Sequence, residues 1–147
     1  MAAERRARAV WEGTLLEGRG YLSTETTQVL SDQPVTWASR TEDPGGRTSP
    51  EELLAAAHAA CYAMALSGAL AGSGTPAERL EVTATCVFDK VGDGWGVTVM
   101  DLHVRGRVPG VDRATFEEVA RAGEEGCPIS NVIRGNVEIR LTAELEG

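Results

Sequence analysis

The sequence has little of what several classes of protein require. It has a single lysine and three cysteines, Cys61, Cys86 and Cys127, in 147 residues. The cysteines are too few and too scattered for a disulfide framework or a CxxC zinc site, so we expect no bound metal. The 14 basic and 22 acidic side chains leave a formal net charge of −8. Such a chain lacks the positive charge that dominates binding to phosphate backbones, and we expect no nucleic-acid partner.

Long uninterrupted apolar segments are also missing. The longest apolar stretch, Leu53 to Ala71, contains His58, Ser67 and Gly68, and the first ten residues are charged where a secretory signal would be apolar. We therefore expect a cytoplasmic protein with no membrane partner. No repeat or linker divides the chain, which is long enough to bury a core without staples, so we expect one domain over residues 1–147.

The first forty residues have the pattern of strands and turns. Strands are expected over Arg8–Glu12 and Tyr21–Val29, joined near the glycines of Gly18–Gly20 into a β-hairpin. The segment Asp43–Gly46, Asp-Pro-Gly-Gly, is expected to be a loop.

The clearest helix start lies in the middle of the chain. Ser49 is a suitable N-cap, Pro50 suits the first helical position, and Glu52 would complete a capping box. The helix is expected from Glu51 to about Leu70 and is apolar nearly all round, which predicts that it is buried inside the fold.

The second half alternates strands with two helical segments. Apolar and polar residues alternate in the expected strands, and the first helix should open at Asp112 or at Thr115, with a Thr115-x-x-Glu118 capping box, and end near Gly126. A further helical turn is expected from Cys127-Pro128. The strands are expected over 80–88, 97–108 and 137–145. Antiparallel strands around two helices, without a βαβ repeat, predict an α+β fold.

Two of the cysteines are candidates for chemistry. Cys61 lies mid-helix, where it could be an ordinary small core residue, but His58 lies one turn earlier and could act on its thiol or could itself be a core histidine. Cys127 lies at the start of a helical turn, where backbone N–H groups favour a thiolate, so helix electrostatics alone predict that Cys127 is the more acidic thiol. Cys86 is assigned to packing on the apolar face of a strand.

Charged residues around the same helix start offer an ion pair. Both Glu51 and Glu52 complement the helix dipole as acids of the first turn, which with the cap explains Glu52, whereas Glu51 is not needed for the cap. Arg40 and Arg47 flank the Pro-Gly-Gly loop beside it, so an Arg–Glu pair is expected. His103 has no ligand-like neighbour on its strand.

Two motifs carry a resemblance. The segment Thr48–Cys61, TSPEELLAAAHAAC, and the later Gly126–Ser130, GCPIS, resemble the OsmC/Ohr family of osmotically inducible and organic hydroperoxide resistance proteins. The His-Ala-Ala-Cys form and the segment Thr36–Arg40, Thr-Trp-Ala-Ser-Arg, are similar to the OsmC branch. The resemblance implies an OsmC-like fold in which antiparallel sheets wrap two central helices of an intertwined homodimer.

The resemblance also implies a cysteine-based peroxidase that reduces organic hydroperoxides, with hydrogen peroxide left open as a second substrate. Cys61 would be the peroxidatic thiol and Cys127 the resolving thiol, joined as a disulfide in the cycle, which reverses the ranking from helix electrostatics. Arg40 and Glu51 would assist, with Arg19 as the alternative arginine, and Glu52 and His58 would support the site. No cofactor is implied beyond an external dithiol or lipoyl reductant, and the residues that bind substrate are not identified.

The spacing on the helix adds a geometric expectation. Ten residues of α-helix separate Glu51 from Cys61 by about 15 Å along the axis and roughly 80° around it. If both serve one site, they must come from different subunits, as in a two-fold homodimer with shared sites.

Two other functions are consistent with the residues. One is a non-catalytic stress-linked dimer that binds a ligand or senses redox state, with Cys61 and Cys127 as a switch. The other is a Cys-His hydrolase using His58, which is weaker because no Asn or Asp partner or oxyanion loop can be placed.

Overall fold

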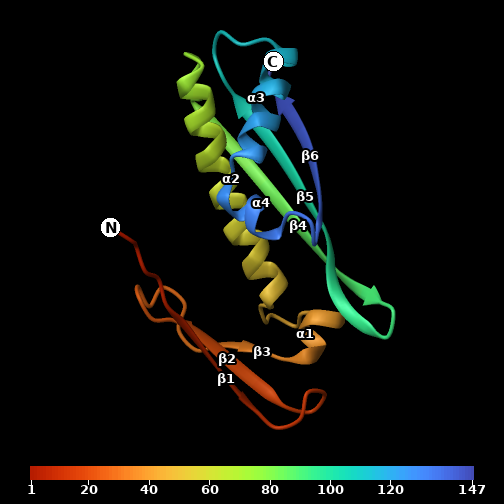
Figure 1. Cartoon of the computed structure of the whole chain (residues 1–147). Coiled ribbons are helices and arrows are strands. Elements are labelled where there is room, and N and C mark those ends of the chain that lie inside the picture. The colour runs from red at the N-terminus through yellow and green to blue at the C-terminus, as the bar shows by residue number, and fades with distance from the viewer. The chain divides into compact units, whose positions relative to one another are not determined.

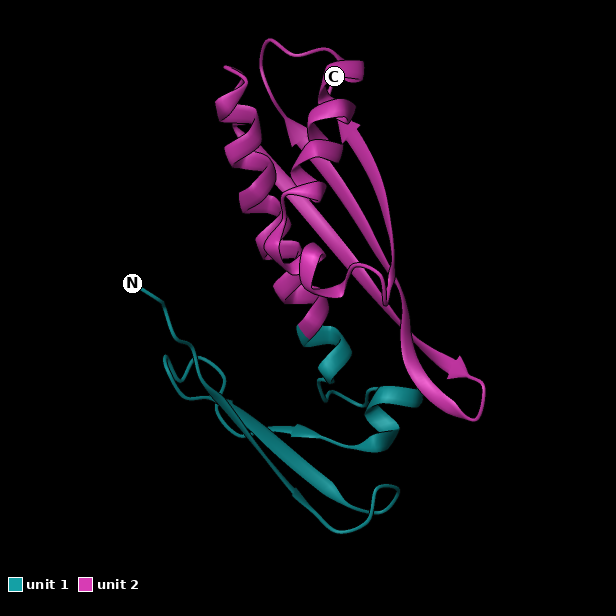
Figure 2. Ribbon diagram, in the orientation of Figure 1, with its two compact units in different colours: residues 1–53 teal, residues 54–147 magenta.

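The computed structural model describes all 147 residues, which form two compact units, Met1–Leu53 and Leu54–Gly147 (Figures 1 and 2). The boundary falls within one continuous helix, α2 (Pro50–Gly72). No change of composition marks it, because a helix interior has no linker signature. One domain over residues 1–147 therefore stays a prediction.

The first unit contains a three-stranded antiparallel sheet of β1 (Ala7–Glu12), β2 (Arg19–Thr24) and β3 (Gln33–Val35). The predicted hairpin is confirmed for β1 and β2. The predicted strand over 21–29 is wrong beyond Thr24, where the chain turns and returns as β3. The backbone N–H of Thr24 donates to the Leu30 carbonyl at 2.8 Å and closes this turn.

A short helix, α1 (Trp37–Thr41), follows β3 and was not predicted. Thr36 caps it, because its hydroxyl accepts from the backbone N–H of Ser39 while the Ser39 hydroxyl accepts from that of Thr36, each at 3.1 Å. A five-residue helix is too short to show a hydrophobic period, so only the capping residues could have indicated it.

The start of α2 agrees with the prediction in part. The Ser49 hydroxyl accepts from the backbone N–H of Glu52 at 3.1 Å, as an N-cap does. The Glu52 carboxylate instead accepts from the Thr48 hydroxyl at 2.7 Å. The reciprocal half of the predicted capping box is therefore replaced by a bond to the residue before the cap.

The second unit places helices on one face of a second three-stranded sheet (Figure 1). β4 (Arg79–Val91) and β5 (Gly94–Arg107) form a long antiparallel hairpin. β6 (Glu138–Leu145), however, pairs with β5 in parallel, so the expectation of purely antiparallel sheets is wrong. A parallel neighbour requires a long crossover, which α3 (Arg113–Glu125) and α4 (Pro128–Ile133) provide between β5 and β6.

The N-cap of α3 differs from one of the two predicted starts. The Asp112 carboxylate accepts from the backbone N–H of Thr115 at 2.7 Å, so Asp112 is the N-cap. The predicted Thr115-x-x-Glu118 capping box is wrong, because Thr115 already lies inside the first turn. The predicted end at Gly126, the C-cap, is confirmed.

The core of the second unit lies between α2, α3 and the sheet. Its buried side chains include Tyr62, Leu66, Leu70, Met100, Leu102, Val104, Phe116 and Ala120. Two glycines permit the close packing of α3. A Cβ on Gly106 of β5 would lie 2.6 Å from the ring of Phe116, and a Cβ on Gly123 of α3 would lie 3.2 Å from the Leu66 backbone.

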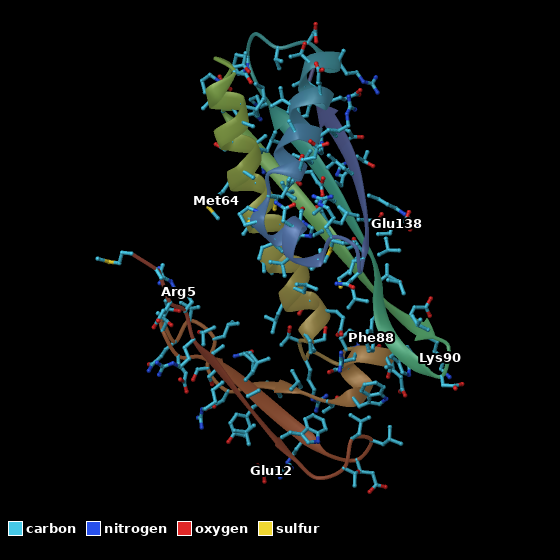
Figure 3. The ribbon with its side chains drawn as sticks, viewed as in Figure 1. Arg5, Glu12, Met64, Phe88, Lys90 and Glu138 are labelled. Atoms are coloured by element: carbon cyan, nitrogen blue, oxygen red, sulfur yellow. The ribbon has the colours of Figure 1, made fainter.

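The burial of α2 differs from the prediction. Within the single chain the helix buries one side and leaves a stripe exposed, which consists of Ala56, Ala57, Ala60, Met64, Ser67, Gly68 and Ala71. Met64 is 70% exposed and points away from the sheet (Figure 3). The helix is long and apolar enough to cross a membrane, a property that it shares with core helices of soluble proteins.

Candidate active site

The second unit brings two of the three cysteines together. Cys61 lies on α2 and Cys127 is the N-cap residue of α4. The two side chains lie close enough for the Cys127 thiol to raise the pKa of Cys61, and no disulfide joins them. Cys127 is fully buried and Cys61 is half-buried. The pair therefore combines one partly accessible thiol with one buried thiol.

Burial dominates the acidity of Cys61. It raises the pKa of the thiol, the backbone N–H of Ile129 lowers that pKa by donating to the sulfur, and Cys127 raises it. No cation contributes to this balance. Since a thiolate is the nucleophilic form, Cys61 needs a positive group that the second unit does not supply.

His58 and Ser130 form a second contact between α2 and α4. His58 Nε2 lies 2.7 Å from Ser130 Oγ, and both residues are fully buried. Burial is the main cause that lowers the pKa of His58, while the Glu124 carboxylate raises it and Arg134 lowers it. Nδ1 of the same ring is buried without a hydrogen-bond partner. His58 is thus a neutral core histidine adjoining the thiol pair.

The first unit contains the predicted Arg–Glu pair, formed by Arg40 and Glu51. Nη2 of Arg40 lies 2.6 Å from Glu51 Oε1, and Nε lies 3.2 Å from each carboxylate oxygen. The Glu51 side chain is only 9% exposed, whereas that of Arg40 is 29% exposed. The guanidinium also lies 5.4 Å from the ring centre of Trp37. Two-point contact with a buried carboxylate and stacking on an indole hold this cation in one orientation.

Arg19, the alternative arginine, does not form this pair. It is exposed on β2 and lines a different hollow, which also includes Arg8 and Arg47. Glu52 is exposed and bonded to Thr48. Among the predicted acidic and basic candidates, the structure therefore couples Arg40 with Glu51.

An apolar pocket of about 230 Å³ lies beside Arg40 in the first unit. Its lining consists of Trp11, Leu15, Val35, Thr36, Trp37, Arg40 and Pro50. Sequence analysis did not identify these residues, because they come from β1, the following loop, β3 and α1, which only the fold brings together. The pocket combines an apolar wall with one cation.

The two remaining candidates lie on the sheet of the second unit. Cys86 on β4 is opposite Met100 of β5 and packs against the core, as predicted. His103 contacts Glu144 at 3.1 Å on the exposed face of the sheet.

The thiol pair belongs to residues 54–147, and the Arg40–Glu51 pair to residues 1–53. Helix α2 carries one member of each, since Glu51 lies in its first turn and Cys61 follows in its interior. The rise of a continuous helix over those ten residues is about 15 Å. The two residues of α2 therefore cannot touch.

Comparison with known structures places this architecture in a defined class. The chain is similar to the crystal structure of the organic hydroperoxide resistance protein OhrB of Bacillus subtilis, with a TM-score of 0.72 and 26% identity, covering 96% of this chain and 98% of that one. An α+β fold of two small sheets with a free thiol pair on its helices thus defines a protein of the OsmC/Ohr class.

Sequence comparison gives the family. The profile described as OsmC-like protein matches residues 43–142. Peroxiredoxin OsmC of Escherichia coli is 38% identical over 139 residues, which cover 95% of this chain and 96% of that protein. An organic hydroperoxide resistance protein of Xanthomonas axonopodis pv. citri is 32% identical over 100 residues, or 67% of this chain and 68% of that protein. The chain belongs to the OsmC-like protein family.

Proposed function

We propose that this protein is a cysteine-based peroxidase that reduces organic hydroperoxides to alcohols. The observation that carries the proposal is the proximity of Cys61 on α2 to Cys127 at the start of α4, which is close enough to raise the pKa of the Cys61 thiol. The family supports it, since the relatives described above are a peroxiredoxin and an organic hydroperoxide resistance protein.

In the first step, the Cys61 thiolate attacks the outer oxygen of ROOH. An S–O bond forms, the O–O bond breaks, and the departing alkoxide takes a proton to give ROH, which leaves Cys61 as a sulfenic acid. The Arg40 guanidinium stabilises the thiolate and the developing alkoxide charge. Glu51 keeps the guanidinium oriented, and the Ile129 N–H donates to the sulfur.

In the second step, Cys127 resolves the sulfenic acid. Its thiolate attacks the Cys61 sulfur, an S–S bond forms, and the departing hydroxide takes the proton lost by the Cys127 thiol to give water. Because the two thiols are already neighbours, the reaction requires only a small approach of α4. A small dithiol or a lipoyl group then reduces the disulfide, and no bound cofactor takes part.

The apolar pocket beside Arg40 is the site that we assign to the alkyl group of the substrate. Its lining is mainly apolar, and its volume of about 230 Å³ suits a chain or ring of several carbons. Hydrogen peroxide has no apolar part to bury there. Alkyl hydroperoxides should therefore react faster than hydrogen peroxide.

The active site is completed by a second copy of the chain. Arg40 and Glu51 of one subunit serve Cys61 and Cys127 of the other, because the helix rise keeps Glu51 and Cys61 of one chain apart. The exposed stripe of α2 supports this homodimer, since contiguous apolar surface on a helix indicates an interface. We also propose a cytoplasmic location, where Cys61 and Cys127 would be returned to the thiol form after each cycle.

The substitution Gly68→Leu tests the dimer. Nothing lies within 4 Å of a Cβ built at Gly68, so the single chain has room for the new side chain. We expect sedimentation to show a shift from dimer to monomer, with the helical circular dichroism retained. Glu118→Leu adds the same side chain to the exposed surface of α3 and should leave the dimer intact. Dimers of unchanged affinity in Gly68→Leu would contradict this interface.

The activity is tested with cumene hydroperoxide and a dithiol. The wild type should consume the hydroperoxide and lose two thiols per chain after one equivalent, and Cys86→Ser should behave in the same way. Cys61→Ser should abolish turnover. Turnover that survives Cys61→Ser would reject the proposal, and reversible disulfide formation without turnover would favour the redox-sensing alternative.

A further inference from the structure

We propose that His58 and Ser130 are positioning residues for the resolving step, whose buried hydrogen bond holds α4 against α2 so that Cys127 stays beside Cys61 after its oxidation. The proposal rests on the proposed peroxidase function. It assigns a role to the one buried polar link between these two helices that the mechanism above does not use.

The sequence spacing places this hydrogen bond one helical turn from the thiols. His58 precedes Cys61 by three residues on α2, and Ser130 follows Cys127 by three residues on α4. Residues at this spacing lie on the same face of a helix. The thiol contact and the His58–Ser130 hydrogen bond therefore join the same two faces, side by side.

Few other polar contacts hold α4 on α2. The helix has six residues, and its Asn131 and Val132 are exposed. At its far end, Arg134 contacts Glu124 at 2.8 Å, which ties α4 to α3 and not to α2. The contacts to α2 at the near end are made by Cys61, to Cys127 and to the Ile129 N–H.

Oxidation changes those contacts at the moment when resolution must occur. Conversion of the Cys61 thiol to a sulfenic acid adds an oxygen to the sulfur that accepts from Ile129 and contacts Cys127. The His58–Ser130 hydrogen bond involves neither sulfur and remains in place. It keeps Cys127 within reach of the sulfenic acid, which otherwise reacts with a second hydroperoxide to give a sulfinic acid.

The unpartnered nitrogen of His58 indicates the direction of this hydrogen bond. A buried N–H without an acceptor costs more than a buried lone pair, so the proton belongs on Nε2 and Nδ1 stays unprotonated. Nε2–H then donates to Ser130 Oγ. A glutamine at position 58 can present an amide N–H from about the same place, whereas a leucine cannot.

The first experiment uses no peroxide and measures the equilibrium of the Cys61–Cys127 disulfide with dithiothreitol, by alkylation and mass spectrometry. Ser130→Ala and His58→Leu should each lower the effective concentration of the two thiols about tenfold. His58→Gln should restore most of it. The double variant should be no worse than either single variant, because both remove one interaction.

Tyr62→Phe is the matched control. The Tyr62 hydroxyl donates to the Ala120 carbonyl at 2.8 Å, so this variant also removes a buried hydrogen bond from α2, but one made to α3. It should lower the melting temperature and leave the disulfide equilibrium within about twofold of the wild type. An equal shift in Tyr62→Phe and Ser130→Ala would mean that general loosening is the cause, and would overturn the proposal.

The second experiment adds cumene hydroperoxide and measures the fraction of chains converted to sulfinic acid per turnover. In Ser130→Ala the rate of the first thiol oxidation should stay within about twofold, while sulfinic acid per turnover rises about tenfold. Wild-type behaviour of Ser130→Ala in both experiments would overturn the positioning role. If the disulfide equilibrium depends on Ser130 but the wild type ignores hydroperoxides, the proposed function is refuted, and what remains is that the hydrogen bond holds the two thiols together.

Discussion

A mixture of two inactive variants gives the sharpest test of shared active sites. Cys61→Ser removes the attacking sulfur. Glu51→Gln removes the carboxylate that holds Arg40 at 2.6 and 3.2 Å, and we expect the loss of this oriented cation to lower turnover about 100-fold. Each variant alone should therefore have almost no peroxidase activity.

The expected recovery follows from the geometry of α2. Random exchange of an equimolar mixture makes about half of the dimers mixed, and each mixed dimer has one site with all residues intact and one with both defects. Activity should therefore return to about a quarter of the wild-type value per chain. Sites built within one chain would regain nothing, because every chain carries one defect.

The assay follows cumene hydroperoxide consumption before and after subunit exchange, with native mass spectrometry to measure the fraction of mixed dimers. A mixture of Cys61→Ser with Cys127→Ser is the matched control. Both residues belong to the second unit and to one thiol pair, so mixing should restore no disulfide-based cycle. Mixed dimers at the expected fraction with no recovered activity would refute the shared site.

Three further predictions concern the same residues. Cys127→Ser should keep the first oxidation but lose one thiol per equivalent of hydroperoxide and accumulate sulfinic acid at Cys61, which intact-mass measurements will detect. Because burial raises the pKa of Cys61, alkylation of that thiol should accelerate as the pH rises, and Arg40→Gln should move the profile to higher pH; superimposable profiles would exclude Arg40 as the stabilising cation. Because burial lowers the pKa of His58, the folded state binds fewer protons than the unfolded chain below about pH 6.5, so its stability should fall as the pH falls through that value. Urea titrations should show that His58→Gln removes this loss, whereas His103→Gln, at an exposed position, retains it.

The sequence predicted the elements whose signals are local. These signals are encoded within a few residues. They are the Ser49 cap with the helix after it, Asp112 as one of the two predicted starts of α3, and the alternation of the strands. The parallel partner of β5 was not predictable in this way, because alternation indicates a strand but not the direction of its neighbour.

The exposed stripe of α2 has a related cause. An all-apolar helix predicts burial without saying what covers it, and within one chain only one side of the helix is covered. The sequence therefore did not indicate that Gly68 and Met64 would be exposed in the single chain. The prediction of a buried helix is wrong for the single chain and agrees with the proposed dimer.

In the candidate site, the contact between residues close in sequence was predicted from the residues themselves, and the contacts between distant residues were not. The Arg40–Glu51 pair joins residues close in sequence, and spacing suggested it. The approach of Cys61 to Cys127 was implied by the family resemblance, since neither residue's surroundings encode the other. The partner of His58 was missed entirely, because Ser130 lies on a distant helical turn that only the fold brings to α2.

Gly106 of β5 and Gly123 of α3 have an effect beyond their own packing. The Phe116 ring fills the place of a side chain at Gly106, and the Leu66 backbone lies against Gly123. A methyl group at Gly106 would overlap the Phe116 ring, and one at Gly123 would crowd the Leu66 backbone, so either would strain the packing of α3. The chain runs directly from α3 through Gly126 to Cys127. We therefore expect alanine at either glycine to disturb the position of Cys127 beside Cys61, because the packing of α3 sets where the chain enters α4.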